Sequence, residues 1–368
     1  MENFDEKLIE PKTGRLARFA KSHWLTVVFL FGFVTDYLLL NRIDDKLDNF
    51  ILLTYVVLAT ASLLLFYLGV AGRLGDWWTA KLRHYMPMLM QYSFGGLLSG
   101  MLIFYGRSGD FISSAPFFAL IIGVIAVNEL VKKQSERLVY NLAVYFVGVF
   151  SYFVLVVPVL VGEMSNLIFF GSGLLALLDV SLTIHTLSRI IPNFINLQKR
   201  LLVFTIASLY AVFNGFYFLN IIPPIPLSLT ELNIYQSVDR SSLGDYRITK
   251  EKQSWFEYLP FVPDYFHPVA GQGATCFARV YAPTKLTTEI VHRWEYVDKN
   301  GDWQEHFSRS YKITGENKNG YRGYTTVTSV HDGKWRCIVE NKRGQVLGKK
   351  TFVIDSTKSP QGLVTVVE

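Results

Sequence analysis

The stretch Leu138–Val161, LVYNLAVYFVGVFSYFVLVVPVLV, sets the class of fold because it contains no charged side chain. A helix of about 20 apolar residues crosses the ~30 Å hydrocarbon layer of a membrane. Backbone amides cannot stay unpaired in lipid, so a helix is the form expected for this stretch. Six further stretches on either side of it share this character, and together they predict seven spans at 24–40, 50–71, 88–105, 114–131, 138–161, 167–184 and 201–222.

The positive charges that flank these stretches alternate between rich and poor connections. Twelve lie on one side: Arg15, Arg18, Lys21, Arg73, Lys81, Arg83, Lys132, Lys133, Arg137, Arg189, Lys199 and Arg200. Three lie on the other: Arg42, Lys46 and Arg107. Lys and Arg accumulate on the cytoplasmic side of membrane helices. The pattern therefore predicts a cytoplasmic N-terminus, seven crossings and an exported segment after residue 222.

Composition indicates which partners to expect. The apolar residues crowd into the first 222 positions, and the remainder has the composition of a soluble domain. The net charge of +6 resides largely beside the predicted spans, so membrane lipids with anionic headgroups are the expected partners. No Lys/Arg cluster is dense enough for a nucleic-acid footprint.

The first 23 residues are polar, and no cleavage site follows the first apolar run. We therefore interpret this first apolar run as a retained membrane anchor.

These observations divide the chain into four predicted parts. Residues 1–23 form a cytoplasmic segment, 24–222 a transmembrane domain of seven helices, 223–270 a periplasmic linker, and 271–368 a periplasmic β-sandwich domain. The fold class is thus a polytopic α-helical membrane bundle followed by an all-β immunoglobulin-like sandwich. The expected location is the inner membrane of a bacterium.

The sandwich is predicted from period-two alternation and from the order of three residues. Apolar and polar side chains alternate from about Ala274 onward, and Asn/Asp-Gly turn signals separate the runs. The order Cys276, Trp294, Cys337 is typical of immunoglobulin-like domains, in which a Trp packs on a disulfide between two sheets. Both cysteines lie in the exported part, which favours a disulfide. The alternative is two buried thiols that act as small hydrophobic residues.

The end of the chain also resembles a known family. The matching residues are His292-Arg293-Trp294, Trp303, Tyr321-Arg322-Gly323-Tyr324, Gly333-Lys334-Trp335-Arg336, Gly344, Leu347 and Phe352-Val353-Ile354. In this order they resemble the bacterial domain of unknown function 2914 family. The resemblance implies a small β domain attached to a bacterial membrane protein, and it implies no activity.

Three aromatic or imidazole rings share one face of a predicted strand. His292, Trp294 and Tyr296 would form an aromatic platform for a ligand such as a sugar. The alternative, which we favour from the sequence, is a sandwich core with a hydrogen-bonded histidine.

Polar residues inside the predicted spans are the other candidates for a site, because each costs about 2.5–3.5 kcal/mol at the bilayer centre on insertion scales. Five are predicted at similar depth near the cytoplasmic side: Asn128, Glu129, Asp179, His185 and Arg189. They would bind an ion, a proton or a headgroup between spans four and six, with Asp179 as the strongest candidate. The alternative is a structural salt-bridge network. Asp36 and Asn214 would form an outer counterpart.

Chemical motifs are missing from the sequence. It contains no Walker loop, HExxH or GxSxG, and its two cysteines form no CxxC unit. We therefore expect no cofactor, metal site or catalytic residues. The predicted role is a non-enzymatic accessory or receptor-like protein whose β-sandwich docks a protein or glycan. The first alternative is a carrier of a small solute, ion or lipid that uses the polar cluster between spans four and six. The second, less favoured, is a membrane enzyme that acts on a lipid-linked substrate.

Overall fold

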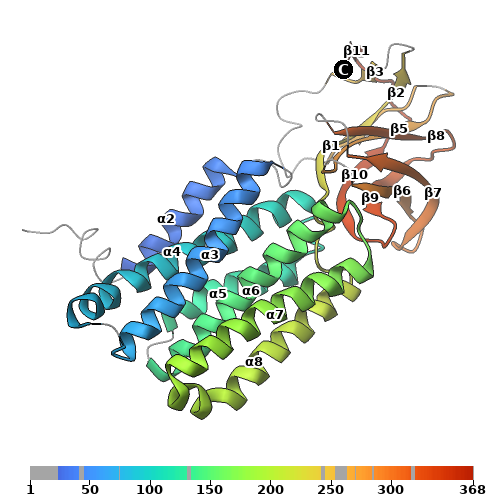
Figure 1. Cartoon of the computed structure of the whole chain (residues 1–368). Helices are drawn as coiled ribbons and strands as arrows, with labels where there is room; N and C mark the ends of the chain where they lie inside the picture. Colours follow the sequence, from blue (N-terminus) through green and yellow to red (C-terminus); the bar gives the residue numbers. More distant parts are fainter. Residues whose placement is uncertain are drawn as a thin grey trace, which may run out of the picture.

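The computed structural model describes residues 24–40, 45–73, 75–130, 134–241, 245–252, 263–269, 271–283, 286–315 and 320–367. At 24–30, 32, 46, 77–84, 125–130 and 134–137 it describes the backbone alone. Within these ranges an α-helical bundle is followed by a β-rich C-terminal domain (Figure 1).

Seven helices lie within the described ranges: α2 (Trp24–Leu39), α3 (Lys46–Val70), α4 (Asp76–Ser108), α5 (Ala115–Leu130), α6 (Gln134–Val161), α7 (Asn166–Ile190) and α8 (Pro192–Phe218). Five contain a stretch long and apolar enough to cross a membrane: Leu47–Val70, Tyr85–Ser108, Leu138–Val161, Asn166–Ile190 and Pro192–Phe218. With 16 residues, α2 is about 24 Å long at 1.5 Å per residue, which is short of a full bilayer. The structure thus supports a helical membrane region with five candidate spans among the described residues.

Small residues bring the helices of the bundle close together. A Cβ atom on Gly96 of α4 would lie 2.5 Å from the Tyr55 ring of α3, and one on Gly173 of α7 would lie 2.9 Å from Tyr210 of α8. Close approach of this kind is how membrane helices associate, since lipid gives apolar side chains no reason to leave it. Accordingly, the outward faces of the helices carry exposed leucines such as Leu174, Leu178 and Leu182.

Two sheets form the body of the β-rich domain. One has the order β1-β5-β8, with β1 (Ser228–Tyr235), β5 (Ala274–Tyr281) and β8 (Tyr321–Val327). The other has the order β4-β10-β9-β6-β7, with β4 (Tyr265–Phe266), β10 (Val346–Ile354), β9 (Gly333–Asn341), β6 (Thr287–Val297) and β7 (Trp303–Thr314). Residues of both sheets share buried apolar clusters, including Ala278 and Val280 from the first and Ile290 and Val339 from the second. The alternation seen in the sequence therefore produces a core between two sheets.

The segment 223–270 differs from the predicted linker. It contains β1, β2 (Ser237–Arg240), β3 (Tyr246–Lys250) and β4. Strand β1 pairs along its length with β5, and a small third sheet has the order β11-β3-β2, with β11 (Val364–Val367) from the end of the chain. The prolines after α8 led to the expectation of a linker, but Ser228–Tyr235 completes the first sheet, so the β-rich domain begins soon after Pro226.

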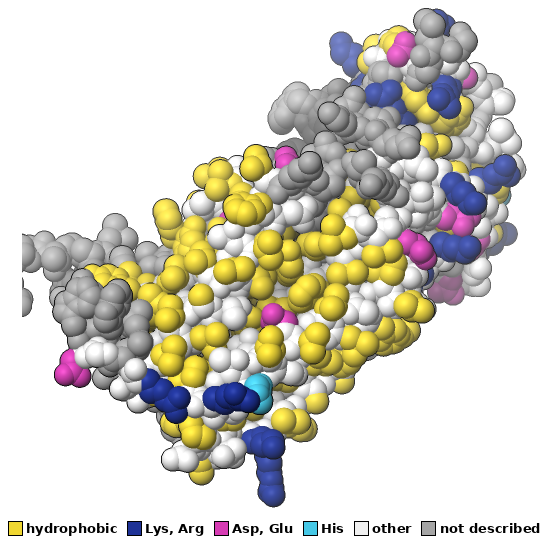
Figure 2. Space-filling model, in the orientation of Figure 1, with side chains coloured by type: hydrophobic (Ala, Val, Ile, Leu, Met, Phe, Trp, Pro, Cys, Tyr) yellow, Lys and Arg dark blue, Asp and Glu magenta, His cyan; other side chains and the backbone are white. Residues whose placement is uncertain are grey.

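The β-rich domain lies at one end of the bundle (Figure 1). The connections α3–α4 and α7–α8 lie at the opposite end of the bundle. The exposed cation Arg73 lies in the first connection, Arg189 lies at the end of α7, and Lys199 and Arg200 lie in the first third of α8. Figure 2 shows a broad hydrophobic face over the helices, with Lys and Arg side chains gathered at the end far from the β-rich domain. The charge asymmetry read from the sequence thus becomes a difference between the two ends of the bundle.

Candidate functional site

The five residues predicted to form a membrane cluster are not gathered into one site by the described contacts. Asp179 is half-buried, and its Oδ2 accepts a hydrogen bond of 2.7 Å from the Tyr145 hydroxyl of α6. His185 and Arg189 are exposed further along α7. The side chains of Asn128 and Glu129 lie outside the described residues. The Asp179 carboxylate is therefore held by a hydroxyl group, and no described contact joins it to His185 or Arg189.

The Asp179 contact continues to a third helix. The Tyr145 hydroxyl lies 2.5 Å from Oγ1 of Thr60 on α3. This arrangement joins α3, α6 and α7 through one carboxylate and two hydroxyl groups. It can hold a proton or stabilise the bundle, and no charged partner is needed for either.

A second carboxylate, Asp36 of α2, is fully buried. Its Oδ1 accepts a 2.6 Å hydrogen bond from the Tyr55 hydroxyl, and its Oδ2 accepts one from the Ser99 hydroxyl. Asn214 instead donates to the Tyr210 carbonyl at 2.7 Å within α8, and no described contact joins it to Asp36. The outer pair predicted from these two residues is therefore replaced by a contact among α2, α3 and α4.

In the β-rich domain, His292 and Trp294 are fully buried and Tyr296 is half-buried. The His292 ring lies 3.1 Å from Thr325 Oγ1 through Nδ1 and 2.9 Å from the Tyr311 hydroxyl through Nε2. Burial lowers the pKa of His292 to about 4, which keeps the ring neutral at neutral pH. Neither His292 nor Trp294 faces solvent, which favours the core interpretation over a ligand platform.

A disulfide joins Cys276 of β5 to Cys337 of β9 and so links the two sheets. The Trp294 side chain lies opposite Cys337 in the β6–β9 register and donates its Nε1–H to Thr325 Oγ1 at 2.9 Å. The sequence prediction of this bridge agrees with the structure. His292 lies against the two sulfur atoms, with ligand atoms of the three residues within 4.8 Å of one another. Because both sulfurs are consumed by the disulfide, this group has no thiolate to offer a metal.

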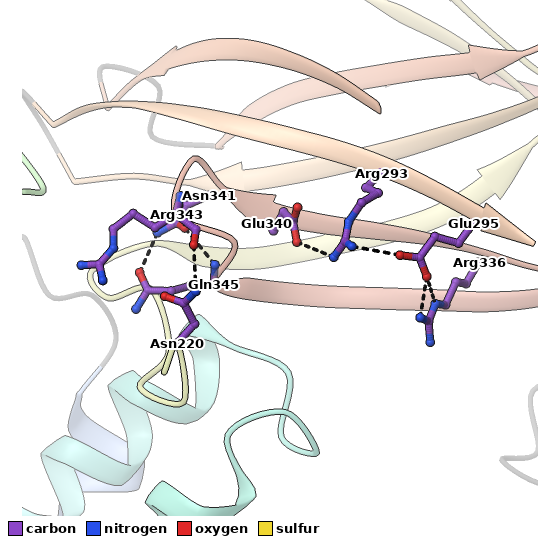
Figure 3. Close-up of polar contacts among 8 residues, drawn as sticks. All are labelled: Asn220, Arg293, Glu295, Arg336, Glu340, Asn341, Arg343 and Gln345. Atoms are coloured by element: carbon purple, nitrogen blue, oxygen red, sulfur yellow. Dashed lines mark hydrogen bonds and ion pairs between the residues drawn. The ribbon is translucent and has the colours of Figure 1, made fainter. Parts of the chain in front are cut away.

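Charges on β6 and β9 form a continuous ladder on one face of the larger sheet (Figure 3). The Arg293 guanidinium lies 2.8 Å from Glu340 and 3.0 Å from Glu295, and Glu295 accepts a 2.6 Å hydrogen bond from Arg336. Arg336 also lies 4.0 Å above the Trp303 ring. Burial raises the pKa of Glu340 despite the adjacent Arg293. Each charge in this ladder is paired with an opposite charge, so the ladder supports the sheet.

The bundle meets the β-rich domain at a turn that could not be singled out from sequence. Asn341–Gln345 connects β9 to β10 and reaches the end of α8 (Figure 3). The Arg343 guanidinium lies 3.7 Å from the centre of the Tyr217 ring and donates to the Tyr217 carbonyl at 3.3 Å. Phe169 stacks on Tyr217 at 3.6 Å, so the Tyr217 ring lies between an aromatic ring and a cation. The sequence Asn-Lys-Arg-Gly indicated only a turn, because its partner is more than a hundred residues away.

Further hydrogen bonds close this junction. Asn220 donates its side-chain amide to the Arg343 carbonyl at 2.8 Å, and Gln345 donates to the Ile222 carbonyl at 2.8 Å. The Asn341 side chain donates to Gln345 Oε1 at 2.7 Å and accepts from the Arg343 amide at 3.0 Å, which shapes the turn. We call the contacts among Tyr217, Asn220, Ile222 and Asn341–Gln345 the junction.

A second tie lies beside the junction. Lys349 of β10 pairs with Asp110, in the connection between α4 and α5, at 3.0 Å. Burial acts to raise the pKa of Asp110, but the Ser113 hydrogen bonds and the Lys349 ammonium outweigh it and hold the pKa below its usual value. With the junction, this ion pair attaches the β-rich domain to the bundle at two places.

One strand of the larger sheet has a free edge among the described residues. Strand β7 pairs only with β6 there, and nine of its twelve residues are exposed. Exposed edge strands present unpaired backbone groups to which another chain can add a strand.

The family comparison matches the end of the chain. The model of the family described as "Protein of unknown function (DUF2914)" matches residues 287–354, which include β6 to β10. No curated protein matches the chain. Among solved structures, the alkylpurine DNA glycosylase AlkC of Pseudomonas fluorescens bound to DNA containing an abasic-site analogue is 11% identical and covers 86% of this chain and 99% of its own. Its TM-score is 0.20, so this likeness carries no argument about fold or function.

Proposed function

We propose that this chain is a non-enzymatic, receptor-like protein of a bacterial inner membrane, whose β-rich domain binds a protein partner outside the cytoplasm. The proposal includes seven crossings, a cytoplasmic N-terminus and an immunoglobulin-like sandwich in the periplasm. Its topology is supported by the exposed cations at the end of the bundle far from the β-rich domain. The disulfide is consistent with an oxidising compartment.

The observation that carries the docking role is the free edge of β7. Strand β7, with twelve residues, is long enough to pair with an added strand. Its one paired strand among the described residues, β6, is tied to β9 by the charge ladder, and β9 is tied to the other sheet by the disulfide. A rigid template lowers the entropy lost when a partner strand is ordered on it. The burial of His292 and Trp294 argues against the aromatic platform that was the less favoured interpretation and that would bind a glycan, so a protein partner is the better supported choice.

This role is tested in cells by placing a photo-cross-linking amino acid at Ser308 of β7 and, as a control, at the exposed Thr357 in the loop after β10. The expected result is one cross-linked protein at Ser308 only. In the protein that carries the cross-linker at Ser308, the further substitution Ser310→Pro removes a backbone donor from the same strand and should abolish the cross-linked product. Equal products at both positions, or a product insensitive to Ser310→Pro, would contradict docking on β7.

A second candidate function, a carrier, is favoured by the Asp179–Tyr145–Thr60 contact. An ionisable side chain inside a membrane helix is a functional candidate by default. The variants Asp179→Asn and Tyr145→Phe keep the shape of the helices while changing the group that holds a proton. Loss of biological activity with normal membrane insertion would favour the carrier, whereas retained activity would leave the docking role.

A further inference from the structure

A cavity of ≈ 300 Å³ lies between the bundle and the β-rich domain, directly beside the junction. Its walls come from the α6–α7 connection, the start of α7, the end of α8, the start of β6 and the β9–β10 turn. It is at the small end of the range of about 300–1,000 Å³ that is usual for small-molecule sites. A cavity of this size holds a polar headgroup and not a whole lipid.

The cavity has charged groups of both signs. Arg343 and Lys342 line it from the β9–β10 turn, and Glu163 and Glu289 line it from the α6–α7 connection and β6. Lys342 lies 3.5 Å from Glu289, while Glu163 has no ion pair among the described residues. Nη1 of Arg343 is shielded from solvent and has no hydrogen-bond partner among the described residues. A buried donor without a partner calls for an explanation, such as a bound group that accepts from it.

The remaining wall is apolar and continues onto the outside of the bundle. Met164, Ile168 and Phe169 line the cavity. Next to them, at the same end of α6 and α7, Leu160 and Leu167 are 77% and 81% exposed. Large apolar side chains exposed at the end of a spanning helix lie in the acyl region of the bilayer. A ligand in the cavity can therefore extend hydrocarbon chains over this surface.

We propose that the cavity binds the headgroup of a phospholipid that carries both a phosphate and a primary amine, that is, a phosphoethanolamine headgroup. The phosphate faces Arg343 and Lys342, and the ammonium faces Glu163 and Glu289. Arginine suits phosphate because its guanidinium donates two parallel hydrogen bonds. The two carboxylates disfavour a purely anionic headgroup, and a primary ammonium donates three hydrogen bonds to them that a quaternary amine cannot. This inference depends on the proposed function only in that this end of the bundle lies at a membrane surface.

The test uses full-length protein, stripped of lipid in detergent and titrated in native mass spectrometry with one lipid at a time. The probes are dioleoyl phosphatidylethanolamine, phosphatidylcholine and phosphatidylglycerol, together with soluble phosphoethanolamine. The expected result is one bound phosphatidylethanolamine with an affinity at least tenfold above that of the other two lipids. Soluble phosphoethanolamine should compete weakly at the same site, since it lacks the chains.

Variants locate the site. Glu163→Gln removes an exposed carboxylate that makes no described ion pair, and it should lower the affinity for phosphatidylethanolamine at least tenfold. Arg343→Gln should lower the affinity for all three lipids. Arg309→Gln and Glu305→Gln, on β7 away from the cavity, are the matched controls and should change nothing. If Arg343→Gln fails to fold, Glu163→Gln and the comparison of lipids still decide the question.

Equal affinity for the three lipids, or no effect of Glu163→Gln, would overturn this proposal. Extraction of the unmodified protein from membranes by alkaline carbonate would instead overturn the proposed membrane function. The two failures are therefore distinguishable.

Discussion

The bundle and the β-rich domain place their charged groups in opposite ways. In the bundle, the buried Asp36 is held by hydroxyl groups of Tyr55 and Ser99, without a cation among the described contacts. In the β-rich domain, Arg293 and Glu295 belong to a ladder of alternating charges. Water can solvate the rim of a sheet, whereas each charge in lipid must be neutralised or hydrogen-bonded inside the protein. The difference is consistent with a bundle that lies in lipid and a β-rich domain that lies in water.

The two regions also differ in what holds them together. The helices rely on close packing at glycines such as Gly96, because lipid provides no hydrophobic drive between helices. The β-rich domain has a buried apolar core, which the hydrophobic effect stabilises, and a disulfide between its sheets. Substitutions that disturb the glycine packing should therefore destabilise the bundle alone, and substitutions that remove the disulfide should destabilise the β-rich domain alone.

The largest expected effect comes from removing the disulfide. Cys276 and Cys337 are separated by 61 residues, and such a loop stabilises a fold by about 4 kcal/mol in the chain-entropy model. The double variant Cys276→Ala/Cys337→Ala should lower the free energy of unfolding of the β-rich domain by an amount of this order. Urea unfolding followed by tryptophan fluorescence measures it, and helical circular dichroism should show the bundle unchanged. Equal loss in both regions would contradict the separation.

Acid should weaken the β-rich domain through His292. Burial lowers the pKa of His292 to about 4, whereas an unfolded histidine titrates near 6.5. Between these values the unfolded state binds more protons, so stability is lost as the pH falls from about 6.5 to about 4, by about 3 kcal/mol in full. Unfolding measured from pH 7 to pH 4 should show this slope, and His292→Gln should remove it. An unchanged slope in His292→Gln would contradict this assignment.

A change in the bundle should act by steric conflict. A Cβ atom at Gly96 would lie 2.5 Å from the Tyr55 ring, and overpacking of this kind costs about 1–3 kcal/mol. Gly96→Val should lower the melting temperature of the bundle in detergent, while Gly106→Val, in α4 with nothing within 4 Å, is the control. Equal effects of both variants would show that helix propensity, and not packing, explains the loss.

The smallest effect is expected at the contacts between the regions. Lys349→Ala breaks a half-buried ion pair with Asp110, but the two Ser113 hydrogen bonds to the carboxylate remain, so the loss should be about 1 kcal/mol. Arg343→Ala removes a cation–aromatic contact of about 0.5–2 kcal/mol. Hydrogen–deuterium exchange should rise at 217–222 and 341–346 in Arg343→Ala and barely change in Lys349→Ala. Both variants should leave the β-sheet amides protected.

Much of this organisation could be predicted from the sequence because it depends on local patterns. Apolar length located the helices, period two located the strands after Ala274, and the order of Cys276, Trp294 and Cys337 predicted the disulfide. The strands before Ala274 were not predicted, because the prolines after α8 and the irregular sequence that follows show no period-two pattern. One of these strands, β1, pairs with β5. No pattern in one sequence links Arg343 to Tyr217 or Asp36 to Ser99, since these contacts depend on how distant elements pack.

In the proposed topology, the β-rich domain and the cationic end of the bundle lie on opposite sides of a membrane. A pair of full-length fusions, with alkaline phosphatase or green fluorescent protein attached after residue 368, tests it directly. We expect an active phosphatase and no fluorescence from the green fluorescent protein. A fluorescent fusion with an inactive phosphatase would place the β-rich domain in the cytoplasm and overturn the proposed topology.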